Sequence, residues 1–331
     1  MEDNELFSAE ITINEIVEPH DFCYQLENYI IPPERRIGNK LFNVVSFDNK
    51  IVRIGITSLG SVHKPILKLE ALSTAPLREN DLKQLKKGIN RWLGLSDDLK
   101  PFYDLVRDDS IMCAAIEMRY GAKDKANFSF FEALIGTVCA QNSQFKRVYS
   151  MMGNLCEHLG SKISINGYTY SAFPSISKCA ACSIEELRAC KVGYRGNYIK
   201  SIAQALEEGQ IDLAKIEQMS YQQAKMNLLK LHGIGPYTAD LCLILAFRRR
   251  DIFYLDSYVR EALKQFYFKG KETSDDVLRD FVTERWPDYQ AWAIAMLTTD
   301  TENLASRMGI PFRFKSGAKE HYEGASQEVV I

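Results

Sequence analysis

Residues 231–239 and 254–258 contain the residue types best suited to chemistry in this chain. The first segment carries Gly233 and Gly235 on either side of one aliphatic residue, Ile234, with a helical pattern before and after it. A turn built on two glycines lets backbone amides approach a ligand closely, and the N-terminus of the helix that follows can bind phosphate. An ordinary tight turn between two helices is the alternative, because glycine is the commonest turn residue.

The second segment contains a carboxylate, Asp256. An aspartate in front of a helical pattern is expected to cap that helix, which here would hold Val259, Leu263 and Phe266. A carboxylate at the start of a helix, lying beside a sugar-phosphate chain, is also well placed to stabilise a positively charged sugar. Because the two roles are compatible, we take Asp256 as the candidate catalytic residue.

Basic side chains form two local groups, although the net charge of the chain is only -2. A net charge near zero does not mark a nucleic-acid binder, so the local groups carry more information. A solvated helix face is the alternative for each of them. Both groups flank the glycine turn, which favours a contact with phosphate. They consist of Arg188, Lys191, Arg195 and Lys200 before the turn, and of Lys225, Lys230, Arg248, Arg249 and Arg250 around it.

Composition limits the class of protein. The chain has 331 residues, of which 46% are hydrophobic, enough for one large domain or two modest ones. No stretch approaches the roughly 18 consecutive apolar residues of a membrane span, and the first residues are acidic, unlike a secretory leader. We therefore expect an intracellular protein without a membrane partner.

The eight cysteines are expected to be reduced thiols in such a protein. Their single cluster, Cys179, Cys182 and Cys190, lacks a fourth ligand at the spacing of a zinc or iron-sulfur site. We expect neither a metal nor another cofactor.

The elements that must position these residues change type once along the chain. Residues 9–72 show the β-branched and alternating pattern of strands, with a hairpin expected from 43–47 and 51–56. From Glu79 to Thr299 apolar residues recur at helical spacing. The sequence therefore predicts an α+β protein with a β-rich N-terminal domain over 1–100, a mostly helical domain over 101–305 and a loose tail over 306–331.

Residues 231–256 resemble the helix-hairpin-helix and Gly-Pro-Asp signature of the DNA base-excision glycosylase superfamily. Residues 131–143 and 192–196 are similar to segments of the 8-oxoguanine and 3-methyladenine DNA glycosylases, and the resemblance extends over about half the chain. It implies that the helical domain is an HhH-GPD glycosylase domain and that the β-rich region is the extra domain of those two branches. The implied partner is double-stranded DNA with damaged bases, and we expect a monomer located with DNA in the nucleus or nucleoid.

The resemblance also implies roles for individual positions. Asp256 takes the place of the catalytic aspartate, and Gly233, Ile234 and Gly235 take the place of the hairpin that grips a phosphate. Asn142 corresponds to the residue that fills the gap left by the flipped nucleotide or contacts the orphaned base. Tyr194 corresponds to a wedge in the opposite strand. For these two, a loop amide and a half-buried aromatic are the structural alternatives. Arg147 and Arg195 complete the expected DNA contacts.

At Tyr237 the sequence differs from the bifunctional members of the superfamily, and this difference bears on the mechanism. Bifunctional members place a lysine there, which attacks the sugar as an amine and then cleaves the strand. A phenol cannot form a Schiff base, and Lys230 belongs to the preceding helix. The bifunctional iron-sulfur branch is disfavoured as well, because no cysteine follows Cys242. The sequence is therefore expected to specify a monofunctional enzyme in which Asp256 acts with water.

The identity of the released base is the least determined point. A cationic alkylated purine is held well by aromatic faces, and Tyr237 and Tyr258 are the expected walls of its pocket. Trp292 is a further candidate, although core packing explains it better. An 8-oxoguanine would need directed hydrogen bonds, which Ile294 and Thr298 cannot supply in the usual way. We therefore expect alkylated purines of the 3-methyladenine type; a monofunctional 8-oxoguanine glycosylase and a non-catalytic DNA-binding protein remain the alternatives.

Overall fold

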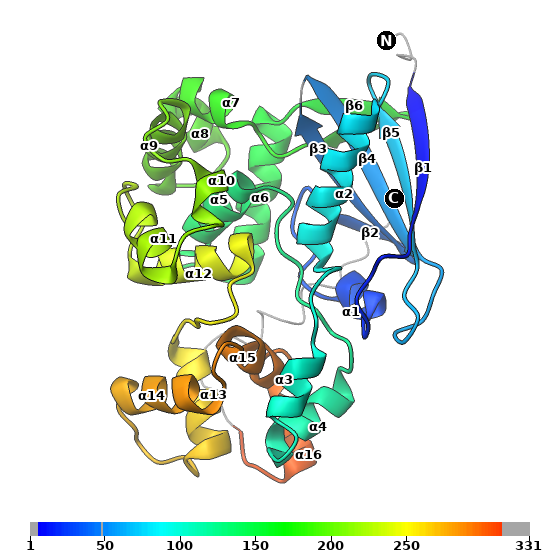
Figure 1. Cartoon of the computed structure of the whole chain (residues 1–331). Helices are drawn as coiled ribbons and strands as arrows, with labels where there is room; N and C mark the ends of the chain where they lie inside the picture. The colour runs from blue at the N-terminus through cyan, green and yellow to red at the C-terminus, as the bar shows by residue number, and fades with distance from the viewer. Residues whose placement is uncertain (1–5, 48, 313–331) are drawn as a thin grey trace.

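A computed structural model describes residues 6–47 and 49–312 of the chain (Figure 1). It confirms the α+β class, with an antiparallel sheet near the N-terminus and helices from there on. Most of the expected tail over 306–331 lies outside the described residues, and the part nearest the helices continues α16 (Thr301–Met308). No helix within the described ranges is long and apolar enough to cross a bilayer.

The sheet has five strands in the order β1-β5-β4-β3-β2, all antiparallel to their neighbours. The expected hairpin is present, since Phe47 pairs with Lys50 around a turn whose Asp48 lies outside the described residues. Two helices, α1 (Phe22–Glu27) and α2 (Glu79–Leu93), pack on the sheet around Trp92, Leu85 and Ile89. The strands are β1 (Phe7–Ile13), β2 (Arg35–Ile37), β3 (Lys40–Phe47), β4 (Lys50–Ser58) and β5 (Leu67–Ser73).

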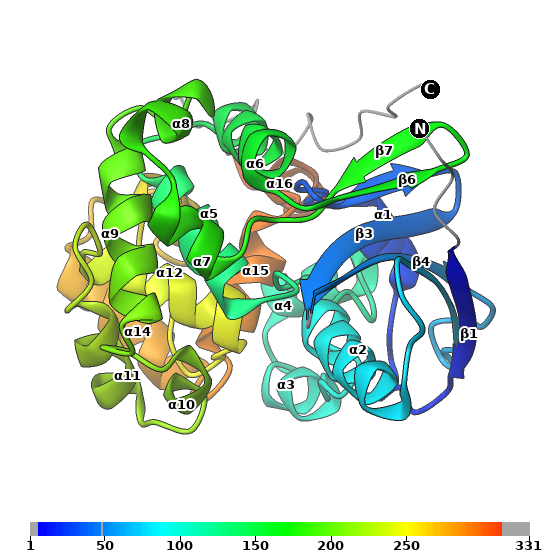
Figure 2. The same cartoon turned by 90° about the horizontal axis from the view of Figure 1, so that it is seen from above.

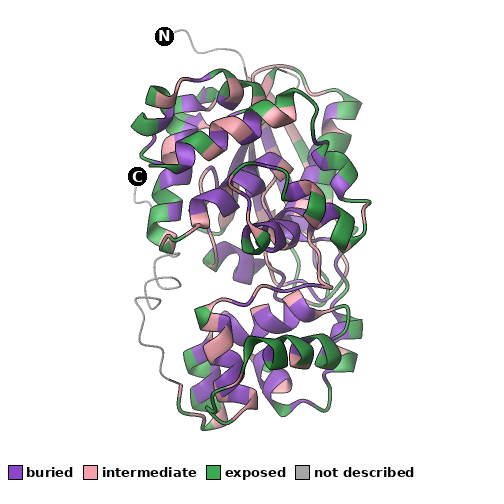
Figure 3. Ribbon diagram, turned by 90° about the vertical axis from the view of Figure 1, so that its left-hand side faces the viewer, coloured by how far each residue is buried: buried purple, intermediate pink, exposed green. Residues whose placement is uncertain are grey.

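The helices form two further groups, each with its own buried core (Figures 1 and 3). The second group combines helices that precede and follow the first in sequence, so the chain leaves it and returns to it. The first group comprises α5 (Phe130–Ala140), α6 (Phe145–Leu159), α7 (Ile176–Ala181), α8 (Ile184–Ala189), α9 (Arg195–Glu207), α10 (Leu213–Ile216), α11 (Tyr221–Leu228) and α12 (Pro236–Phe247). The second comprises α3 (Lys100–Leu105), α4 (Ser110–Met118), α13 (Ser257–Tyr267), α14 (Asp275–Arg285), α15 (Gln290–Thr298) and α16.

One segment expected to be helical is a β-hairpin, formed by β6 (Lys162–Ile165) and β7 (Tyr168–Ser171). Its apolar side chains join a small core with Val44 of β3, so the hairpin lies against the sheet (Figure 2). The signal was in the sequence: Ile163 and Ile165 alternate with polar residues before the dipeptide 166–167, Asn-Gly. This is the preferred two-residue hairpin turn, because both of its residues adopt positive φ, here +51° and +81°.

The basic group around the glycine turn is largely neutralised, which corrects the expectation that it faces phosphate. Arg248 and Arg250 both pair with the buried Asp97, just after α2. Lys225 lies 2.8 Å from Asp240, and the Arg249 guanidinium donates to Asp251 at 2.7 Å. The spacing of charges along the chain could not show this, since Asp97 is distant in sequence. These arginines fix the path of the chain between α12 and α13.

Glu132 of α5 is buried, and burial raises the pKa of its carboxyl to about 8 from an ordinary 4.5. Between pH 4.5 and about 8, the carboxyl of Glu132 is therefore protonated in the folded protein and ionised in the unfolded chain. The free energy of unfolding falls as the pH rises through this range, because the folded state binds more protons. Burial also lowers the pKa of His20 to about 3 and that of Lys123 to about 8. Both of these groups make the free energy of unfolding rise with pH, His20 below about pH 6.5 and Lys123 above about pH 8. Between pH 6.5 and 8 the effect of Glu132 is therefore not opposed by either of them.

We expect the free energy of unfolding of the wild type to fall by on the order of 1 to 2 kcal/mol between pH 6.5 and 8. In Glu132→Gln, which keeps an oxygen for the Asn127 amide at 3.0 Å, this slope should largely disappear. Denaturant unfolding at several pH values measures it. Parallel slopes in the two proteins would refute the assignment.

Candidate functional site

The glycine turn joins α11 to α12, and steric contacts explain its first glycine. Gly233 has a φ of +89°, and a Cβ there would lie 2.3 Å from the Tyr198 ring. Ile234 is buried in the core of the first helical group and anchors the turn. Gly235, the N-cap of α12, is different, because a Cβ there would meet no atom within 4 Å. The backbone at Gly235 therefore borders open space at the N-terminus of a helix, as an anion site requires.

A glutamine that the sequence interpretation missed braces this turn. Gln141, the residue after α5, donates from Nε2 to the carbonyl of Gly233 at 2.7 Å and to Thr238 Oγ1 at 3.1 Å. The contact ties the turn to the loop between α5 and α6. The next residue, Asn142, is exposed in that loop and has a positive φ of +46°. Asn142, which is expected to fill the gap left by the flipped nucleotide, thus lies in a loop that Gln141 ties to the glycine turn.

Arg195 differs from the expectation of a surface DNA contact. Its side chain is buried, with 2% of the residue exposed. The guanidinium donates to the carbonyls of Val138 and Gln141 and, at 2.9 Å, to Ser143 Oγ. A buried guanidinium must satisfy its donors, and the carbonyls at the end of α5 do so. In this structure Arg195 supports the loop that presents Asn142.

Tyr194 lies directly before α9, and 51% of it is exposed. The Arg195 guanidinium lies 4.6 Å from the centre of its ring, and the Tyr198 ring meets it edge-on at 5.8 Å. Tyr198 is also the ring that would block a Cβ at Gly233. The exposed Tyr194, the Asn142 loop and the glycine turn are therefore connected through shared neighbours, on one side of the first helical group.

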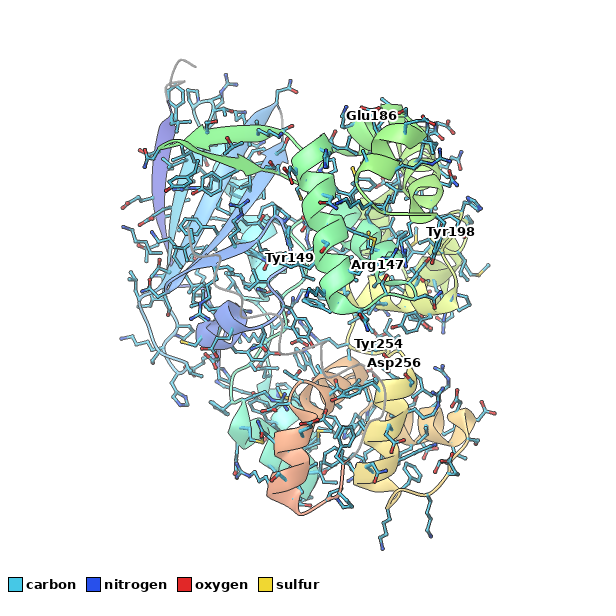
Figure 4. The ribbon with its side chains drawn as sticks, turned by 180° about the vertical axis from the view of Figure 1, so that it is seen from behind. Arg147, Tyr149, Glu186, Tyr198, Tyr254 and Asp256 are labelled. Atoms are coloured by element: carbon cyan, nitrogen blue, oxygen red, sulfur yellow. The ribbon has the colours of Figure 1, made fainter. Side chains whose placement is uncertain are left out.

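Asp256 is the N-cap of α13, as expected: Oδ1 accepts a hydrogen bond from the amide of Val259 at 2.8 Å. The side chain is half-buried, and it has no ion-pair partner in the part of the chain that the structure describes. The Tyr254 ring meets the Tyr237 ring of α12 edge-on, with the centroids 5.8 Å apart. This contact joins the Asp256 segment to the helix that begins at the glycine turn. Figure 4 shows Tyr254 and Asp256 where the second helical group faces α6 and its exposed Arg147.

A cavity of about 260 Å³ opens beside Tyr254, between the two helical groups. Its wall is mostly apolar and includes Gly136 of α5, Met152 of α6, Leu241 and Ile244 of α12, and Ile294 and Thr298 of α15. The last two were expected at pocket positions, and they line the cavity. Residues of the N-terminal region, Tyr29 and Glu34 among them, close another part of it.

The aromatic residues expected to form the pocket are placed differently. The hydroxyl of Tyr258 donates to Thr301 Oγ1 of α16 at 2.9 Å, and Tyr258 does not line the cavity. Tyr237 is not among the residues that line the cavity, and its ring contacts Tyr254, which is. Trp292 is buried against the Tyr289 ring, as core packing predicts. The aromatic residues that do line the cavity are Tyr29, Phe145, Phe253 and Tyr254, none of which the sequence interpretation selected. Tyr254 and Tyr258 each lie two residues from Asp256, so the sequence around Asp256 could not show which of them borders the cavity.

The three clustered cysteines are buried in the core of the first helical group. Burial raises the pKa of Cys179 to about 12 and that of Cys190 to about 11, which disfavours the thiolates that bind metals. Cys182 Sγ donates to the carbonyl of Cys179 at 3.1 Å. Among the described residues, no three His, Cys, Asp or Glu side chains are grouped so that they could hold a metal ion.

Comparison with known proteins places these features in a family. Residues 135–288 match the model of the HhH-GPD superfamily base excision DNA repair proteins. The DNA-3-methyladenine glycosylase of Bacillus subtilis is 25% identical over 87% of this chain and 92% of its own length. A probable N-glycosylase/DNA lyase of Methanothermobacter thermautotrophicus is 26% identical over 74% of this chain and 83% of its own.

Solved structures share the fold over almost the whole chain. The 3-methyladenine DNA glycosylase of Archaeoglobus fulgidus has a TM-score of 0.73 at 19% identity, covering 91% of this chain and 98% of that one. The 8-oxoguanine glycosylase/lyase of Clostridium acetobutylicum, in complex with double-stranded DNA, has a TM-score of 0.70 at 18% identity, covering 93% and 99%. The sheet and both helical groups therefore belong to one known architecture.

Proposed function

This chain is a DNA glycosylase of the HhH-GPD superfamily, and we propose that it is a monofunctional one that releases damaged purines, alkylated bases of the 3-methyladenine type foremost. The substrate is double-stranded DNA, and the products are the free base and an abasic site. The observation that carries the proposal is Asp256, a half-buried carboxylate with no ion-pair partner in the described ranges, two residues after Tyr254, which lines the cavity.

DNA binding begins at the backbone. The amides near Gly233 and Gly235 hold one phosphate at the N-terminus of α12, where the helix dipole favours an anion. The damaged nucleotide leaves the stack at a cost of about a few kcal/mol. Asn142 occupies the gap, Tyr194 wedges the opposite strand, and Arg147 contacts the backbone from α6. Arg195 acts indirectly, because its guanidinium holds the loop that presents Asn142.

Base release needs one carboxylate and one water. As the bond between the base and C1′ of the sugar lengthens, positive charge develops on the sugar, and the carboxylate of Asp256 stabilises it. The water attacks C1′ and passes a proton to the carboxylate of Asp256, and the electrons of the broken bond leave with the base, so that a cationic alkylated purine departs as a neutral base. The helix cap fixes the orientation of the carboxylate before the substrate arrives, because Val259 N already donates to it.

Three features support an alkylated purine as the preferred base. The cavity wall is mostly apolar and includes the Tyr254 ring, which can attract a cationic base. The hydroxyl of Thr298 donates to the carbonyl of Ile294 at 2.7 Å and is not available as a donor to the base. The B. subtilis relative is named for 3-methyladenine. An 8-oxoguanine is the second candidate, favoured by the name of the DNA-bound C. acetobutylicum structure.

A panel of duplexes tests the function, each with one damaged base: 3-methyladenine, 7-methylguanine, hypoxanthine, 1,N6-ethenoadenine or 8-oxoguanine. We expect free base from at least one alkylated duplex, followed by strand breaks only after hot alkali. Release of 8-oxoguanine alone would select the second candidate. A protein that binds these duplexes and releases none would be a DNA-binding module instead.

The absence of lyase activity has its own test, borohydride trapping on a duplex with the preferred lesion or with an abasic site. We expect no covalent adduct with the wild type, because the phenol of Tyr237 cannot form the Schiff base that borohydride reduces. In Tyr237→Lys, an amine replaces the ring that contacts Tyr254, and an adduct should form. A trapped adduct with the wild type would show that another amine attacks the sugar.

We also propose that the protein acts as a monomer, with a catalytic domain over residues 101–305. The separate cores support this division. The sheet core ends at Leu95, the core of the second helical group begins at Leu99 apart from Tyr24 of α1, and the core of the first group begins at Phe131.

A further inference from the structure

An ion pair from outside the helical groups borders the cavity. Glu34 lies between α1 and β2, and Lys125 lies in the segment before α5. Oε2 of the glutamate is 2.8 Å from Nζ of the lysine, and the two side chains are only 5% and 3% exposed. A charged pair this deeply buried needs a reason, because such pairs contribute little to stability once the cost of desolvation is counted.

The hydrogen bonds of this pair are incomplete. Trp92 Nε1 donates to Glu34 Oε1 at 2.6 Å, and Lys125 Nζ donates to the carbonyl of Gln25 at 3.0 Å. Oε2 accepts no hydrogen bond of good geometry from the described residues, despite its closeness to the ammonium. The ammonium has three N–H groups, and the one directed to Gln25 is the only one that makes a hydrogen bond of good geometry with a described residue. Oε2 of the glutamate and two N–H groups of the lysine are therefore left without such a bond at the edge of the cavity.

The other polar side chains on the cavity wall already have partners. Thr298 and Thr299 donate to the carbonyls of Ile294 and Ala295 at 2.7 and 2.8 Å. Asn127 Nδ2 donates to Glu132 at 3.0 Å. Asp124 Oδ1 accepts from the Tyr24 hydroxyl at 2.6 Å. Of the side chains on this wall, Glu34 is therefore the one with a buried oxygen that has no hydrogen bond from the described residues, and such groups are rare unless a ligand or water completes them.

We propose that Glu34 and Lys125 recognise the edge of the extruded base: the carboxylate accepts an N–H of the base, and the ammonium donates to the neighbouring ring nitrogen or carbonyl oxygen. The inference rests on the proposed function of the cavity as the base pocket. It selects purines that present a donor next to an acceptor, such as the 6-amino group and N7 of an adenine. The N-terminal region would thus take part in choosing the lesion.

The test compares two free bases as inhibitors of 3-methyladenine release from methylated duplex DNA. Adenine and purine differ only by the 6-amino group. With the wild type, we expect adenine to inhibit at concentrations about tenfold to a hundredfold lower than purine, the usual effect of one hydrogen bond to a charged group. Equal inhibition by the two bases, or none by either, overturns the proposal.

The variant is the double substitution Glu34→Gln with Lys125→Met. It removes both charges together, so no unpaired charge stays buried, and the amide oxygen introduced in place of the carboxylate can still accept from Trp92 Nε1. We expect the preference for adenine to vanish and 3-methyladenine release to slow by about tenfold to a hundredfold. A double variant that keeps the preference of the wild type also overturns the proposal.

A matched control is Lys40→Met with Glu70→Gln, the same substitutions at a more exposed pair between β3 and β5. It should behave like the wild type, and similar melting temperatures would exclude a loss of fold. The proposed function and the role of the ion pair can be refuted separately. A wild type that releases no base from any duplex refutes the proposed function, whereas normal release without discrimination between adenine and purine refutes only the role of the pair.

Discussion

Asp256→Asn is expected to slow base release by about a hundredfold to ten-thousandfold while leaving duplex affinity almost unchanged. The amide keeps the shape of the side chain but removes the negative charge that stabilises the developing sugar cation. It does not remove the helix cap, because asparagine caps helices as well as aspartate does, and its Oδ1 can still accept from Val259 N. Single-turnover release and equilibrium binding on the same lesion duplex measure the two effects separately.

Asp212→Asn is the matched control for this variant. Asp212 caps α10 in the same way, with its carboxylate accepting from the amide of Ala214 at 3.0 Å, and it is exposed. The same chemical change there should alter neither binding nor release. If Asp256→Asn retains wild-type excision, Asp256 is only a helix cap and the mechanism proposed above is wrong.

Gly235→Ala is expected to weaken binding to damaged and undamaged duplexes alike, by about tenfold to a hundredfold. Gly235 has an ordinary φ of -93°, and the added Cβ meets no atom within 4 Å, so the free protein should fold as before. In the complex, the methyl group would occupy the space through which a phosphate approaches the amides at the start of α12. Binding curves at several salt concentrations should show the loss with every sequence, since phosphates carry no base information.

Two other glycines separate this effect from general damage. Gly209→Ala introduces a methyl group at a φ of +71° in open space, so it bears the cost of backbone strain without approaching the turn. It should bind DNA normally. Gly233→Ala combines a φ of +89° with a 2.3 Å approach to Tyr198, and it should lower the melting temperature as well as the affinity. Unchanged affinity in Gly235→Ala would mean that the turn only connects two helices.

Much of the site could be predicted from local patterns. The turn at Gly233, the cap at Asp256 and the strand hairpin around residues 47–50 each depend on a few neighbouring residues. Such features follow from φ preferences and capping hydrogen bonds, which act over one or two turns of chain. The hairpin over 162–171 belongs to the same class, and its Asn-Gly turn would have identified it.

Features that depend on distant partners could not be predicted in this way. Arg195 belongs to a basic group in the sequence, but carbonyls at the end of α5 bury it. Arg248 and Arg250 belong to another, but Asp97 neutralises both. A charge pattern gives the sign of a segment and says nothing about which opposite charge or carbonyl will pack against it.

The sequence by itself determined the class of the fold, the turn that suits a phosphate and the single carboxylate that follows it, because glycine conformation and helix capping are local physics. Only the tertiary structure decided what surrounds them: that Tyr254 rather than Tyr258 borders the cavity, and that Glu34 of the N-terminal region meets Lys125 of the segment before α5 there. The cavity and its charged residues come from segments that are far apart in the chain and are brought together by packing, so a short sequence pattern cannot predict them.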